Sequence, residues 1–359
     1  MKWILALVLF LPFSPAKHKP VEKSETAPDP AGLFDSSEVI NLELSGNLNT
    51  IFKDLADQSE YHPATLSYKK ADSSVVSIEL KVKTRGHFRK KAGNCFYPPL
   101  LLNFPKENVP ADSFFAGQEK LKLVTPCKGD EYVIREYLVY KLYNLVTEKS
   151  FRARLVRVVY DDTEKHKTSK PLYGILLEDE NQMAARNGSV IEEKRLLLPQ
   201  QVNFEIFHKM AVFEYLIANT DWSVKYRQNV KLINNQKGDL FIPVPYDFDH
   251  SGMVSAPYAK PATELEMSSV RQRRYRGYCL TDLSQLNDAF ALFDELKSEI
   301  YKTYSENPLL DEKYKKNTAR FLDEFYQTIH DAGQRQREFG YPCREDGTGN
   351  VVIKGYGKY

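Results

Sequence analysis

The sequence predicts an α+β protein with a β-rich N-terminal half and an α-rich C-terminal half. Between residues 39 and 104, short apolar runs alternate with breaks at Gly, Asn, Ser or Pro, which is typical of a mostly antiparallel sheet. Residues 283–333 carry two helical patterns, which Asn307 and Pro308 separate. At 359 residues, the chain is long enough for two domains or one two-lobed unit.

The individual elements follow from local patterns. Strands are predicted over 39–44, 64–70, 75–84, 98–104, 118–125, 151–160 and 172–177. Helices are predicted over 130–146, with Asp130 as the N-cap, and over 204–218. Two further strands, 230–233 and 240–244, flank an Asn- and Gly-containing turn, which predicts a hairpin.

Residues 1–16 have the layout of a secretory signal peptide. An early lysine precedes an apolar run over 3–13, and small residues follow it, so we expect cleavage near Ala16. The run is short for a bilayer span, which predicts no stable membrane insertion. Residues 17–36 are then expected to be a flexible lead, and the mature protein to be secreted or periplasmic.

Net charge and cysteine content indicate which partners and which covalent cross-links to expect. A formal net charge of +2 gives no broad electrostatic case for nucleic acid, so we expect no nucleic-acid partner. The four cysteines of an exported chain predict two disulfides, and three pairings are open. We prefer Cys95 with Cys127 and Cys279 with Cys343, because each pair then falls within one half of the chain.

The stretch from Asn219 to Gly252 gathers acidic and amide side chains, and we predict that it forms the active site. Asp221 lies in the loop that follows the second predicted helix. In an antiparallel hairpin the start of one strand lies beside the end of the other, so Asn229 should lie next to Asp247 and Asp249. Oxygen ligands gathered in this way suit one or two hard cations such as Mg²⁺.

A basic connection follows the third predicted strand, over residues 84–94. It contains two glycines and four basic side chains, Arg85, Arg89, Lys90 and Lys91. One interpretation is a loop that cradles phosphate with backbone amides and cations. The other is a solvated basic hairpin, which composition alone favours.

Several segments in order resemble the CotH-like secreted kinases, an atypical branch of the protein-kinase fold related to spore-coat protein CotH. These segments are TRGHFRKK, KLKLVTP, VIREYLVYKL, LYGILLEDE, ANTDW and PVPYDFDHSG. The resemblance implies a bilobal protein-kinase-like fold. The β-rich N-terminal lobe would span 37–180, the α-rich C-terminal lobe with the metal and catalytic loop 181–345, and a tail 346–359.

The resemblance also implies an activity, the Mg²⁺- or Mn²⁺-dependent transfer of the ATP γ-phosphate to a hydroxyl of a protein substrate in the cell envelope or outside the cell. Asp221 would orient the attacking hydroxyl or accept its proton. Asn229, Asp247 and Asp249 would be metal ligands. Seven residues separate Asp221 from Asn229, where conventional kinases have four.

The same resemblance assigns three residues to nucleotide binding. Arg85 would contact phosphate, Lys122 would be the nucleotide lysine, and Glu178 would lie at the hinge near the adenine. By analogy, Lys122 would form an ion pair with Glu136. The arginine-rich segment 268–278 would dock an acidic substrate or a phosphate, or form a solvated turn between the lobes.

Two alternative functions remain open at this point. The first is a catalytically inactive nucleotide-binding or interaction protein of the cell envelope, in which the aspartates form a structural network. The second is a metal-dependent phosphoester hydrolase that uses the same carboxylates to activate water. Trp222, beside Asp221, is predicted to pack and fix the loop in each case.

Overall fold

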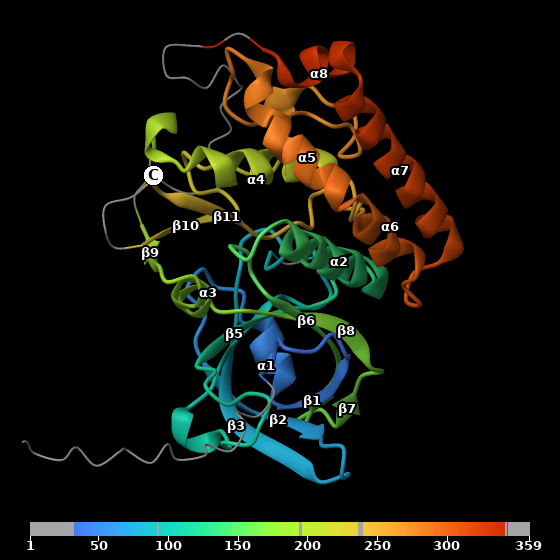
Figure 1. Ribbon diagram of the computed structural model, residues 1–359. Helices are drawn as coiled ribbons and strands as arrows, with labels where there is room; N and C mark the ends of the chain where they lie inside the picture. Colours follow the sequence, from blue (N-terminus) through green and yellow to red (C-terminus); the bar gives the residue numbers. More distant parts are fainter. Residues whose placement is uncertain (1–31, 92, 194–195, 236–239, 342, 344–359) are drawn as a thin grey trace, which may run out of the picture.

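The computed structural model describes residues 32–91, 93–193, 196–235, 240–341 and 343 (Figure 1). The predicted signal peptide, most of the predicted lead and the predicted tail over 346–359 lie outside the described residues. The described chain is a mixed α+β structure in which a sheet-rich region precedes a helical region. Of the helices in this part of the chain, none is long and apolar enough to cross a membrane.

The sheet-rich region is a closed barrel. Its strands are β1 (Ile40–Gly46), β2 (His62–Lys69), β3 (Val75–Thr84), β4 (Leu100–Asn103), β5 (Lys120–Val124), β6 (Ala153–Asp162), β7 (Lys167–Thr168) and β8 (Leu172–Leu177). They are hydrogen-bonded in the order β1-β2-β3-β4-β5-β8-β6-β7. The predicted antiparallel pairing is correct for these neighbours, but β1 also pairs in parallel with β6 and closes the barrel.

The barrel closes around an apolar core because its strands alternate between inward and outward residues. In β3, for example, every second residue from Val76 to Thr84 is buried. The core includes Leu44 of β1, and the short helix α1 (Leu48–Lys53) adds Leu48 and Ile51 to it. Each strand of the closed ring therefore contributes one face to the barrel interior, whereas the two exposed residues of β7 only extend the sheet beside β6.

The remaining elements are a small sheet, the helices of the helical region and η1, which lies beside β3 of the barrel. The α-helices are α2 (Asp130–Val146), α3 (Glu180–Arg186), α4 (Phe204–Leu216), α5 (Asn287–Glu295), α6 (Lys297–Ser305), α7 (Glu312–His330) and α8 (Ala332–Phe339). The 3-10 helices are η1 (Lys106–Asn108), η2 (Pro199–Gln201), η3 (Thr263–Leu265) and η4 (Leu283–Leu286). Strands β9 (Val190–Glu192), β10 (Val230–Asn234) and β11 (Ile242–Pro245) pair antiparallel in the order β11-β10-β9.

Two predicted helix boundaries are wrong. Gly129 is the N-cap of α2, so Asp130 is the first helical residue and not the cap. The two patterns over 283–333 become η4, α5, α6, α7 and the start of α8. Helix α7 ends at His330, and the Asp331 side chain then accepts a hydrogen bond from the Gln334 amide and caps α8.

A second apolar core joins α2 to the helical region. It contains most of the apolar side chains of α2, which lie all around that helix, residues of β6 and β8 such as Leu155 and Ile175, and the buried faces of α4, α5 and α7. Figure 1 shows α2 between the barrel and the later helices. The disulfides are Cys95–Cys127 and Cys279–Cys343, which confirms the preferred pairing.

A substitution in the core where the barrel closes should destabilise the folded protein. Leu44 is fully buried, and its register partners are Leu66 of β2 and Tyr160 of β6. We expect Leu44→Ala to lower the free energy of unfolding by about 2–5 kcal/mol, because it leaves a cavity between the two pairings. Urea unfolding measures the loss.

The matched control is Val75→Ala, because Val75 of β3 is 60% exposed. This variant should stay within about 0.5 kcal/mol of the wild type. Equal losses for the two variants would show that Leu44 does not pack as described.

Candidate functional site

One cavity brings together the basic loop over 84–94 and the stretch that follows α4. Its volume is about 260 Å³. Five of the seven predicted site residues line it, Arg85, Asp221, Asn229, Asp247 and Asp249. The loop over 84–94 is therefore a wall of this cavity.

Local hydrogen bonds fix the loop that carries Asp221. The chain leaves α4 through Ala218, whose φ is +52°, and Asn219 Oδ1 then accepts a hydrogen bond from the Asp221 amide at 3.1 Å. The buried Trp222 donates its indole N–H to the Asn219 carbonyl at 3.2 Å. Trp222 thus packs and fixes the loop, as predicted.

The long spacing between Asp221 and Asn229 is absorbed by a small turn. Ser223 and Gln228 exchange two backbone hydrogen bonds of 2.9 and 3.0 Å, which close the intervening residues into a loop. Asn229 therefore returns to Asp221, and its Nδ2 lies 3.1 Å from Asp221 Oδ2 and 2.8 Å from the Asp221 carbonyl oxygen. The extra residues do not separate the two side chains.

The β10–β11 hairpin places the second half of the carboxylate cluster. Val230 pairs with Pro245, and the Tyr246 amide donates to the Asn229 carbonyl at 3.0 Å. Asn229 lies just before β10 and Asp247 just after β11, so both are at the same end of the strand pair. Their φ angles are +50° and +63°. Non-glycine residues in this region cost about 1–3 kcal/mol each and cluster at functional sites.

The two aspartates after β11 have neighbours that orient them. The Asp247 amide donates to Tyr140 Oη at 2.9 Å, and Tyr258 Oη donates to Asp249 Oδ2 at 2.9 Å. Burial raises the pKa of Asp247, and the nearby charge of Asp249 raises it further. Burial likewise raises the pKa of Asp221.

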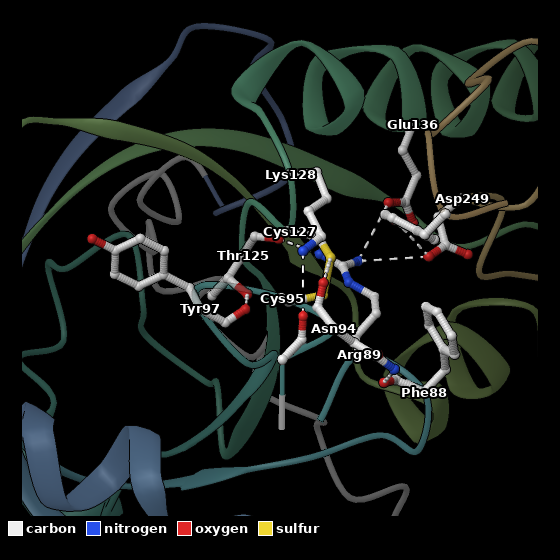
Figure 2. The surroundings of a disulfide bond; sticks show 12 residues. Phe88, Arg89, Asn94, Cys95, Tyr97, Thr125, Cys127, Lys128, Glu136 and Asp249 are labelled. Atoms are coloured by element: carbon white, nitrogen blue, oxygen red, sulfur yellow. Dashed lines mark hydrogen bonds and ion pairs between the residues drawn. A yellow bond between two sulfur atoms is a disulfide. The ribbon is translucent and has the colours of Figure 1, made fainter. Parts of the chain in front are cut away.

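Arg89 is the cation at the centre of the site. Its Nη1 lies 3.8 Å from Glu136 Oε2 and 4.0 Å from Asp249 Oδ2, and its Nη2 donates to the Thr125 carbonyl (Figure 2). Burial by itself lowers the pKa of Arg89. The Tyr258, Asp249 and Glu136 side chains outweigh that effect and hold the pKa above its ordinary value.

The Cys95–Cys127 disulfide attaches the basic loop to the segment that precedes α2 (Figure 2). Beside it, the Phe96 amide donates to the Cys127 carbonyl at 3.3 Å. Within the loop, Asn94 Nδ2 donates to the Phe88 carbonyl at 2.7 Å. The covalent bond therefore limits how far the loop can move from the carboxylates.

Lys122 and Glu178 do not line the cavity. The expected pair between Lys122 and Glu136 is wrong, because Glu136 faces Arg89 while Lys122 Nζ lies 3.4 Å from Glu180 Oε2. Burial and the charge of Arg85 lower the pKa of Lys122 to about 8.

Glu178 has structural partners instead of a position beside the cavity. Its carboxylate accepts two hydrogen bonds of 3.0 Å from the Arg186 guanidinium and one of 2.9 Å from the Arg152 amide. It is 4% exposed, so these bonds satisfy a buried charge.

The arginine-rich segment 268–278 supports the site from outside. Arg276 Nη1 donates to the Trp222 carbonyl at 2.8 Å. The Arg273 guanidinium lies 3.7 Å from the centre of the Phe321 ring and 3.2 Å from Glu324. These two arginines therefore brace the fold, which neither interpretation of this segment anticipated.

Sequence reasoning missed the tyrosines that hold the aspartates, Tyr140 and Tyr258. For Tyr140 a signal was present. Glu136 and Tyr140 are four residues apart on α2, so their polar groups project from the same face of the helix, and both residues are buried. A polar stripe on a buried helix indicates partners in the core.

The donor set suits a cation that also binds phosphate. Within the described residues, no group of three or more His, Cys, Asp or Glu side chains is arranged to hold a metal ion. Mg²⁺, however, is commonly held by one or two carboxylates together with substrate phosphates. Asp247, Asp249 and the Asn229 amide oxygen are chemically suited to that mode of binding.

Comparisons with known proteins give one structural match to report. No protein-family model and no curated protein sequence matches the chain. Among solved structures, the Helicobacter pylori proinflammatory kinase CtkA matches with a TM-score of 0.39 and 12% sequence identity, over 69% of this chain and 93% of that chain. A likeness of this size carries no argument about activity.

A buried carboxyl group lies behind the Asp221 loop. Glu214 of α4 is 1% exposed, and its backbone carbonyl accepts a hydrogen bond from the Asn219 amide at 2.8 Å. Burial raises the pKa of Glu214 well above its ordinary value, and the charge of Asp221 adds to the effect. The ionised form is therefore disfavoured in the folded protein.

This arrangement predicts a pH dependence of stability. The pKa of Glu214 is higher in the folded than in the unfolded state. Its contribution to the free energy of unfolding is therefore fully present below the unfolded pKa of about 4.5, and it is lost as the pH rises through the folded pKa. Glu214→Gln cannot ionise. It should exceed the wild type in free energy of unfolding at pH 8, by on the order of 1 kcal/mol or more, with a smaller advantage at pH 5.

Urea unfolding at the two pH values measures this difference. The exposed Glu299→Gln serves as the control and should show no such pH-dependent gain. A gain for Glu214→Gln that is the same at pH 5 and pH 8 would contradict the ionisation argument.

Proposed function

We propose that the protein is a CotH-like atypical protein kinase that transfers the γ-phosphate of ATP to a protein hydroxyl with Mg²⁺ or Mn²⁺. The observation that supports this best is the shared cavity, in which Arg85 and Arg89 from one loop face Asp221 and Asp247 from another segment. Phosphoryl transfer requires this combination, because it is catalysed mainly by positioning and by charge stabilisation.

The nucleotide would be bound by the cationic side of the cavity. Arg85 would donate to phosphate oxygens, and Lys122 of β5, which lies outside the cavity lining against the Tyr246 ring, would add a second positive charge nearby. A divalent cation held by Asp247, Asp249 and Asn229 would neutralise the charge that develops on the phosphates. Arg89 keeps Asp249 oriented through their contact.

Asp221 is proposed to act on the acceptor hydroxyl. The hydroxyl oxygen forms a bond to the γ-phosphorus, the bond from that phosphorus to the bridging oxygen breaks, and the hydroxyl proton passes to Asp221. Burial raises the pKa of Asp221, which brings it closer to the pH at which a general base works best. Gln228 and Asn229 hold its carboxylate at 3.4 and 3.1 Å.

We also propose a two-lobed organisation for the protein and a location outside the cytoplasm. The barrel would be the core of an N-terminal lobe over 37–180, and the helical region a C-terminal lobe over 181–345. The apolar run near the N-terminus supports an exported, secreted or periplasmic protein. Its substrate would then be a protein of the cell envelope or the exterior.

Incubation with radiolabelled ATP and Mg²⁺ or Mn²⁺ tests the activity. We expect label on protein with the wild type. Asp221→Asn should reduce labelling roughly 10²- to 10⁴-fold, because it removes the proton acceptor. Asp247→Asn should reduce it by about 10²-fold or more, because it removes a charged metal ligand.

Asp288→Asn is the control, since Asp288 is exposed on α5 and lies outside the cavity. Unchanged labelling in both site variants would reject the proposed site. Release of free phosphate without labelled protein would favour the hydrolase. A Mg²⁺-dependent thermal shift with ATP, but with no turnover, would favour the inactive nucleotide-binding protein.

The basic loop provides a matched pair of variants for nucleotide binding. Arg85 lines the cavity, whereas Lys91 of the same loop is exposed and does not line it. Arg85→Gln should weaken Mg²⁺–ATP binding by roughly 10- to 100-fold, because a charge-assisted hydrogen bond is lost. Lys91→Gln should bind like the wild type, as measured by calorimetry. An equal loss of Mg²⁺–ATP affinity in both variants would show that the loop contributes only through its overall positive charge.

A further inference from the structure

A second cavity, of about 590 Å³, lies between α2, α7 and the chain that follows the Asp249 segment. It shares no lining residue with the candidate active site. Four cations line it, Arg135, Arg271, Lys313 and Arg320. It therefore presents a concentration of positive charge that the proposed function does not use.

Aromatic rings and backbone carbonyls hold two of these cations in place. The Arg135 guanidinium lies 4.0 Å from the centre of the Tyr314 ring, and its Nη1 lies 3.4 Å from the Val254 carbonyl oxygen. The Arg271 guanidinium lies 4.6 Å from the Phe321 ring centre, and its Nη1 donates to the Gly252 carbonyl at 3.2 Å. Fixed side chains lose little conformational entropy on binding a ligand.

The two carboxylates that line the cavity, Asp311 and Glu324, have partners other than Arg135 and Arg271. Asp311 Oδ1 caps α7 and accepts a hydrogen bond from the Tyr314 amide at 2.8 Å. Glu324 pairs with Arg273, which is outside the cavity lining, at 3.2 Å. In the described part of the chain, no carboxylate forms an ion pair with Arg135 or Arg271.

A neutral donor completes the cavity. The Ser255 hydroxyl lines it and makes no hydrogen bond to any other described residue. Guanidinium groups match the oxygens of a tetrahedral phosphate in paired hydrogen bonds, and a hydroxyl adds a further donor. An excess of cations over carboxylates also favours a doubly charged anion over a single carboxylate.

We propose that this cavity binds a phosphate dianion, with Arg135 and Arg271 as its main ligands and Arg320, Lys313 and Ser255 completing the site. The ligand chemistry is shared by free inorganic phosphate and by a phosphorylated side chain of a protein. The site does not rest on the proposed kinase activity, because its residues lie outside the first cavity.

Calorimetry with the full chain tests the proposal, using inorganic phosphate and a phosphoserine hexapeptide as probes at constant ionic strength. The measurements use the Arg85→Gln background, so that phosphate in the first cavity does not contribute. Arg135→Gln and Arg271→Gln should each weaken binding at least tenfold. Arg274→Gln should not, since Arg274 is exposed in the same segment and does not line the cavity.

Ser255→Asp provides a test that leaves every cation in place. Ser255 has a φ of +53°, which aspartate tolerates better than most residues, so the variant should fold. Its carboxylate would occupy the cavity and weaken phosphate binding at least tenfold. Unfolding midpoints equal to that of the background confirm that each variant is folded.

Equal affinity for the two probes would identify free phosphate as a sufficient ligand. At least tenfold tighter binding of the phosphopeptide than of its unphosphorylated form and of phosphate would identify a phosphoprotein. Absence of binding by both probes, or binding that Arg135→Gln, Arg271→Gln and Ser255→Asp leave unchanged, overturns the proposal.

Discussion

The buried charge of Arg89 is the constraint on which the candidate active site depends. A buried guanidinium must be compensated, and the partners of Arg89 come from separate elements: Glu136 from α2, and Asp249 from the chain after β11. Arg89 itself belongs to a loop of the barrel. Moving the loop, the helix or the hairpin would separate Arg89 from one of these partners, so the three hold one relative arrangement. The Cys95–Cys127 bond reinforces it by attaching the loop near the start of α2.

Helix α2 is the element that transmits this constraint to the backbone. Its apolar side chains belong to the second core, while Tyr140, one turn after Glu136, accepts a hydrogen bond from the Asp247 amide. Asp247 has a left-handed backbone that costs about 1–3 kcal/mol, and one hydrogen bond contributes only about 0.5–1.5 kcal/mol in return. The strained conformation therefore needs further support, which the hairpin pairing and the Arg89 network provide.

Local reasoning could predict much of the candidate site, because a hairpin brings its two outer ends together whatever the rest of the chain does. That logic placed Asn229 beside Asp247, and the Ser223–Gln228 turn shows why the longer spacing does no harm. The barrel closure was beyond such reasoning, since strand periodicity does not show that β1 pairs with β6. The partner of Glu136 was missed for the same reason. Arg89 and Lys122 are both basic, and only the tertiary path of the 84–94 loop selects between them.

Consecutive residues of α2 serve the two cavities: Glu136 pairs with Arg89, which lines the first, and Arg135 lines the second. Neighbouring residues on a helix point in different directions, so Glu136 faces Arg89 while Arg135 faces the second cavity. Arg135 and Arg271 also contact the backbone at Val254 and Gly252, shortly after Asp249. A phosphate group shared by these arginines would brace α2 against that segment. Because α2 is packed as part of one core, such bracing would act on Glu136 and Asp249 together, and so on the two carboxyl groups that hold Arg89 in place.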